Sequence, residues 1–138
     1  METFSPVIIA STNIFALDAI RQLYLHGRYY GVGLVSCAAI SSVLMHITET
    51  KHGLTELCFP GYSQLFLNID RFFGVLSALY GVYLFYCNPN KKKIQVVLPI
   101  IGGICSVIGE LTNNLVFYTC LHSIWHPCAY YGLKYVSF

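Results

Sequence analysis

Three histidines, one aspartate and one serine are the side chains whose types and spacing could support chemistry in this chain. Ser42 and His46 lie four residues apart, as do His122 and His126, and Asp70 lies between the two pairs along the sequence. Residues four apart share one face of a helix. Ionisable side chains are costly in an apolar, membrane-like setting and tend to mark functional sites there. The set therefore predicts a metal site.

Zinc is the cofactor that this set of residues favours. Three neutral imidazoles, here those of His46, His122 and His126, leave a fourth position open for water, as in catalytic zinc sites. Zinc can lower the pKa of such a water to about 7. We expect Asp70 to orient that water or to take its proton, and Ser42 to donate a hydrogen bond to a developing oxyanion. The six cysteines form no C-x-x-C pair, so a structural zinc site of that type is not predicted.

The composition indicates a membrane protein. Of 138 residues, 56% are hydrophobic and only 10% are charged, whereas soluble domains carry about 25% charged residues. A single span needs roughly 20 mostly apolar residues, so the chain accommodates about five spans. The net charge of +2 is small and the basic residues are scattered, which excludes a nucleic-acid partner.

Apolar runs and the breakers between them predict five helices, over residues 5–25, 29–50, 64–87, 94–110 and 115–135. Pro99, Gly102 and Gly103 predict a kink in the fourth. We find no internal repeat and no linker. The expected fold is all-α, a polytopic transmembrane helical bundle of about five spans, forming one domain over residues 1–138.

The depths of the five side chains agree. With a helical rise of about 1.5 Å per residue, His46 and Ser42 lie roughly 6 and 12 Å from the exit of the second helix. By the same rise, Asp70 lies about 9 Å inside the third helix, and His122 and His126 about 10 and 16 Å inside the fifth. All three helix ends are on one side of the membrane, so the five groups are predicted to form one layer.

The distribution of basic residues predicts the orientation. One side of a five-span bundle carries most of them, and the other carries only Lys51 and Arg71. The basic side has Arg21, Arg28, Lys91, Lys92, Lys93 and Lys134. The C-terminus is therefore expected to face the cytoplasm or the mitochondrial matrix, and the N-terminus the opposite space, in an endomembrane or the mitochondrial inner membrane.

These motifs resemble the CREST superfamily of membrane hydrolases, and most closely its transmembrane-protein-8/myomaker group. The resemblance rests on Thr12-Asn13, Ser42-x-x-x-His46, Asp70-Arg71-Phe72-Phe73-Gly74 and His122-x-x-x-His126, with Glu49 where that group often carries an acid. It implies that the three histidines bind zinc beside Asp70 and Ser42, and that the reaction is hydrolysis of a lipid amide or ester bond. Members typically have seven spans, and Met45 stands where an aromatic residue commonly precedes the motif histidine.

Two other functions remain open at this stage. The chain could be a structural or accessory subunit of a larger membrane complex, with a retained but idle metal site and with protein partners or further copies completing the bundle. It could also be a non-catalytic lipid-binding or fusion-type protein. In every case membrane lipids are expected partners. Two smaller expectations are a local ion pair of Asp18 with Arg21 and an interfacial position for tyrosines such as Tyr130.

Overall fold

The computed structural model describes residues 4–49, 57–88 and 93–136, and these ranges are helical with short connections and contain no strand. The elements are α1 (Phe4–Ser11), a 3-10 turn η1 (Thr12–Phe15), α2 (Ala16–Leu25), α3 (Tyr29–Thr48), α4 (Ser63–Cys87), α5 (Ile94–Leu111) and α6 (Leu115–Val136). The all-α prediction is confirmed. Helix ends differ from the predicted ones by no more than two residues, because strong breakers punctuate this sequence.

Within the ranges that the structure describes, four segments are long and apolar enough to cross a membrane, judged by length and composition: Phe4–Leu25, Tyr29–Thr48, Ser63–Cys87 and Ile94–Leu111. The first of these comprises α1, η1 and α2. Helix α6 has 22 residues, which is enough length for a span, but its two histidines and several tyrosines lower its mean hydropathy. The fifth predicted span is therefore the polar one, and it carries two of the candidate ligands.

The connection between α2 and α3 shows why the chain turns where it does. Gly27 has a φ of +68°, a backbone conformation that glycine adopts without steric cost. Its N–H donates to Tyr24 O at 3.0 Å, and the Arg28 N–H donates to Leu23 O at 2.8 Å. This pair of bonds is the Schellman motif, which satisfies the last carbonyls of a helix.

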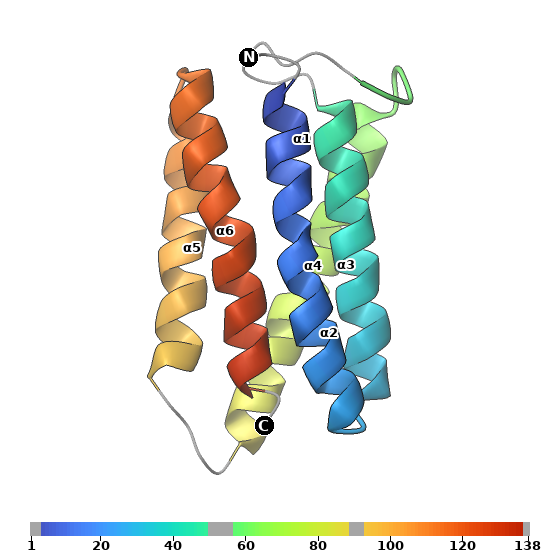
Figure 1. Ribbon diagram of the computed structural model, residues 1–138, viewed down its shortest axis with the longest axis vertical. Helices are drawn as coiled ribbons and strands as arrows, with labels where there is room; N and C mark the ends of the chain where they lie inside the picture. Colours follow the sequence, from blue (N-terminus) through green and yellow to red (C-terminus); the bar gives the residue numbers. More distant parts are fainter. Residues whose placement is uncertain (1–3, 50–56, 89–92, 137–138) are drawn as a thin grey trace.

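The helices form two packed pairs joined by the first span (Figure 1). Helix α3 packs on α4 and α5 packs on α6, while α1, η1 and α2 contact both α3 and α6. The first turn of α1 and the last turn of α6 lie at opposite ends of the bundle. The chain thus forms an arc in the order α4, α3, first span, α6, α5.

The core lies where the first span, α3, α4 and α6 meet. Its buried residues are Ala16, Ala19, Leu23, Val35, Leu84, Tyr130 and Leu133. Between α5 and α6 the contact depends on a small residue, since a Cβ added at Gly132 would collide with the Pro99 ring. Small residues that let backbones approach closely are a common basis of helix packing in membranes.

One predicted ion pair is replaced by another. Asp18 pairs with Lys134 of α6, at 2.6 Å between Oδ2 and Nζ, and no ion pair joins it to Arg21 among the described residues. The local spacing favoured Arg21, but the tertiary approach of α2 and α6 supplies a closer cation. The pair links α2 to α6, about two turns beyond His126 along α6.

Candidate metal centre

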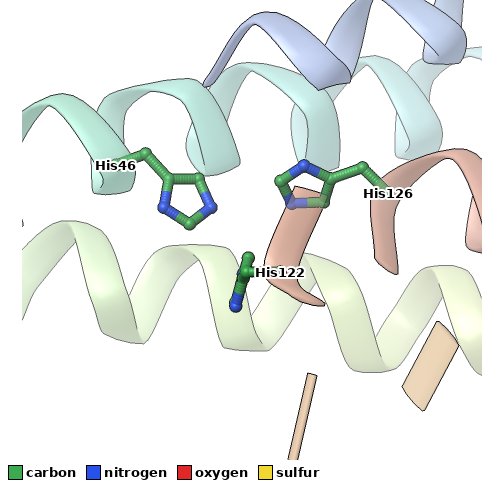
Figure 2. A group of neighbouring side chains, drawn as sticks. All are labelled: His46, His122 and His126. Atoms are coloured by element: carbon green, nitrogen blue, oxygen red, sulfur yellow. The ribbon is translucent and has the colours of Figure 1, made fainter. Parts of the chain in front are cut away.

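The imidazoles of His46, His122 and His126 converge inside the bundle. His46 comes from the last turn of α3, and the other two come from one face of α6. Their exposed fractions are 0%, 6% and 4%, and one ligand atom from each lies within 4.8 Å of the others. Figure 2 shows the rings of His46 and His126 turned toward each other across one space. The three histidines that the sequence predicted to converge therefore lie together in the structure.

The donor set fits a metal ion. The Nε2 atom of His46 is buried and has no hydrogen-bond partner among the described residues, and such an orphaned polar atom is costly unless something binds it. Tetrahedral zinc with nitrogen ligands at 2.0–2.1 Å sets those nitrogens about 3.3 Å apart. In the structure, one ligand atom from each histidine lies within 4.8 Å of the others, so their separations must shorten by at most about 1.5 Å to reach the zinc value. Three buried histidines can therefore hold a metal ion here.

His46 is held from behind by an acid and a tyrosine. Its Nδ1 lies 3.1 Å from Oε2 of Glu49, the residue that follows α3. The hydroxyl of Tyr118 donates to both oxygens of the same carboxylate, at 2.8 and 2.9 Å. Burial raises the pKa of Glu49, but the hydrogen bonds from His46 and Tyr118 outweigh it and hold the pKa below its usual value. Glu49 is thus a buried carboxylate in the ionised form.

His126 is oriented by the 3-10 turn of the first span. The Thr12 hydroxyl donates to Ile9 O at 2.6 Å, so its oxygen accepts from Nδ1 of His126, also at 2.6 Å. That arrangement places the ring proton on Nδ1 and the lone pair on Nε2. The Nε2 atom lies 3.2 Å from Oγ of Ser42, which puts Ser42 beside the ligand atom.

A second chain of hydrogen bonds supports Ser42. Asn13 Nδ2 donates to Ser42 Oγ at 3.2 Å, and the Tyr130 hydroxyl donates to Asn13 Oδ1 at 2.7 Å. Asn13 and Tyr130 are 5% and 7% exposed. The expectation of an interfacial Tyr130 is therefore wrong, because α6 turns this tyrosine toward Asn13 in the interior.

The centre opens onto a large cavity, where Asp70 is found. The cavity has a volume of about 1080 Å³ and lies between the α3–α4 and α5–α6 pairs. Ser42, Asp70, His122 and His126 all contribute to its wall, and Asp70 itself is half-buried on α4. Its rim carries exposed apolar side chains of α4 and α5, among them Val75 and Ile100. The cavity thus combines polar groups at the histidines with an apolar opening toward the surface.

Comparisons with protein-family models, with curated proteins and with solved structures gave no match to this chain. The candidate site therefore stands on its own geometry. Sequence reasoning overlooked Tyr118, although it lies four residues before His122 and so shares its helix face. Glu49 was noted only through a family pattern, but its spacing of three from His46 is itself a sufficient signal.

Proposed function

We propose that this chain is a zinc-dependent membrane hydrolase that acts on a lipid amide or ester bond. The observation that carries the proposal is the convergence of three buried imidazoles, two of which, those of His122 and His126, line a cavity together with Asp70 and Ser42. A structural site is normally closed by four protein ligands, whereas three histidines leave a position for a reacting group. The CREST-like order of the motifs supports the same class of reaction.

Each residue at the site has a separate role in the proposed reaction. His46, His122 and His126 would hold zinc, which when bound would supply Lewis acidity toward a water molecule and a carbonyl oxygen. Asp70 accepts the proton of the attacking water and passes it to the leaving group. Ser42 donates its hydroxyl proton to the oxygen on which negative charge develops. Asn13 and Tyr130 keep the Ser42 oxygen in place through their hydrogen bonds.

The cavity suits an amphiphilic substrate. Its volume of about 1080 Å³ is at the upper end of small-molecule sites, which span about 300–1,000 Å³. The polar groups at the histidines would meet the scissile bond, and the apolar rim would accommodate hydrocarbon. With the C-terminus on the cytoplasmic side, as the basic residues favour, the centre lies beneath the headgroups of the opposite leaflet.

Metal content is the first measurement. The full chain, purified in detergent, should contain about one zinc per molecule by elemental mass spectrometry. His122→Ala should abolish this content, since two imidazoles alone make a weak site. His26→Ala is the matched control: His26 is exposed in the turn between α2 and α3, and its loss should leave the zinc unchanged.

Activity is the second measurement. Reconstituted protein should release fatty acid from lipid amides or esters, and Asp70→Asn should slow this release by about 10²- to 10⁴-fold while zinc remains bound. Purified wild type without zinc, or hydrolysis at an equal rate by Asp70→Asn, would sink the proposal.

A second candidate function is that of an accessory subunit with an idle metal site. It is favoured by α4, which buries only Ser77 and Leu84 among its 25 residues and so leaves a long face for another chain. Purification with partners at fixed stoichiometry, together with bound zinc and no hydrolysis, would favour this role. An active monomer in detergent would exclude it.

A further inference from the structure

Glu49 and Tyr118 are a buried, hydrogen-bonded pair that has no role in the reaction proposed above. Glu49 is 5% exposed and Tyr118 is 0% exposed, so both polar groups are removed from solvent. A buried carboxylate is costly unless it is paired and hydrogen-bonded. The three contacts to Glu49, one from His46 and two from Tyr118, meet that requirement.

We propose that Glu49 and Tyr118 are positioning residues, which fix the tautomer and the ring orientation of His46 so that its Nε2 faces the metal. The proposal rests on the metal centre proposed above. A carboxylate can only accept, so His46 must carry its ring proton on Nδ1 to form the bond to Oε2. The lone pair is then on Nε2, the atom that is buried without a hydrogen-bond partner among the described residues.

The end of α3 brings the carboxylate to this position. Glu49 has φ −71° and ψ 134°, so it leaves the helical conformation directly after Thr48. Its N–H still donates to His46 O at 3.4 Å, which keeps the residue against the last turn. The side chain thereby reaches back to the ring three residues earlier.

Tyr118 connects the Glu49–His46 hydrogen bond to the helix that carries the other two histidines. It lies on α6 one turn before His122, and its ring centroid is 5.2 Å from that of His122. The tyrosine therefore joins the end of α3 to the helix that carries both remaining imidazoles. Partners of this kind keep ligand rings aligned, and their loss typically lowers metal affinity by about 10- to 100-fold.

The test measures metal affinity in the full chain in detergent, with zinc titrated against a competing chelator. Glu49→Ala should weaken zinc binding by about 10- to 100-fold. Glu49→Gln should recover part of the loss, because its amide oxygen still accepts from Nδ1. Tyr118→Phe should give a smaller loss of the same sign. Asp18→Ala removes a carboxylate paired at the far end of the bundle and should leave the affinity unchanged.

Cobalt spectroscopy separates positioning from a general loss of structure. Co²⁺ bound by the wild type should show visible ligand-field bands, and Tyr118→Phe should shift them while the helical circular dichroism stays constant. Zinc affinity equal to wild type in Glu49→Ala, or an equal loss in Asp18→Ala, would overturn the inference and leave the metal centre standing. A wild type that binds no metal would overturn both proposals.

Discussion

Buried polar atoms in an apolar helical bundle are costly unless they are hydrogen-bonded. Around the histidines, neighbouring side chains supply such bonds, as Thr12 does for His126 and Glu49 for His46. Helical spacing alone predicted which histidines share a face, because four residues make about one turn. Spacing did not predict that Tyr118 would hydrogen-bond to Glu49, or Tyr130 to Asn13. A tyrosine in a span is equally suited to the membrane interface, and the sequence of α6 does not reveal its rotation about its own axis.

Tyr130→Phe should destabilise the bundle. Removing the hydroxyl leaves the buried Asn13 Oδ1 without its donor, and an unsatisfied buried polar group costs about 1–3 kcal/mol. Unfolding of the purified chain in mixed micelles, with a chelator present, should show this loss in the free energy of unfolding. Tyr83→Phe is the matched control, since Tyr83 is 56% exposed. Equal stability of the two variants would contradict the role assigned to this hydrogen bond.

Thr12→Val should weaken metal binding without emptying the site. Valine has nearly the same shape as threonine but cannot accept from Nδ1 of His126, which donates to the Thr12 hydroxyl oxygen at 2.6 Å. We expect a loss of affinity of about 10-fold or more, measured by chelator competition. Ser11→Val serves as the control, because the exposed Ser11 hydroxyl bonds only the Ile8 carbonyl. Identical affinities in the two variants would mean that Thr12 does not orient His126.

At the scale of the elements, the helices were predictable almost to the residue because glycine, proline and charged clusters separate them. The 3-10 turn Thr12–Phe15 was not, since a 3-10 segment inside a helix has no strong sequence signal. That turn matters, because it presents Thr12 to α6 and Asn13 to α3. The three histidines meet inside the bundle, but helical spacing and helix ends alone do not specify their hydrogen-bond partners.

The α5–α6 contact gives an element-scale prediction. Gly132→Ala adds a methyl that collides with the Pro99 ring, and forcing extra volume into packed helices costs about 1–3 kcal/mol. A lower melting temperature in detergent should report it. Gly33→Ala is the control, because nothing lies within 4 Å of its added Cβ. There the change should stabilise α3 by about 0.5–1 kcal/mol, so the two variants should shift in opposite directions.

At the scale of the whole molecule, the first turn of α1 and the last turn of α6 lie at opposite ends of the helical bundle (Figure 1). The all-helical arrangement of the described residues followed from composition and periodicity. The order of the helices around the arc (α4, α3, first span, α6, α5) could not be predicted from the sequence. The first span packs between α3 and α6 through contacts between residues about a hundred positions apart, such as Thr12 with His126.

Two natural cysteines test the orientation. Cys58 precedes α4 and Cys87 ends it, and both are exposed. In variants retaining one of them, an impermeant thiol reagent added to sealed vesicles with the cytoplasmic face outward should label Cys87 directly. Cys58 should react only after the vesicles are permeabilised. The reverse pattern would invert the topology that the basic residues favour.

The apolar rim of the cavity, between α4 and α5, has a kinetic consequence. A reactant that enters through that opening arrives by lateral diffusion within one leaflet and never crosses an aqueous phase. The turnover rate of the proposed hydrolase would then follow the mole fraction of the reactant among its neighbours in the bilayer, and dilution with an inert phospholipid would slow it even when the amount per millilitre is held constant.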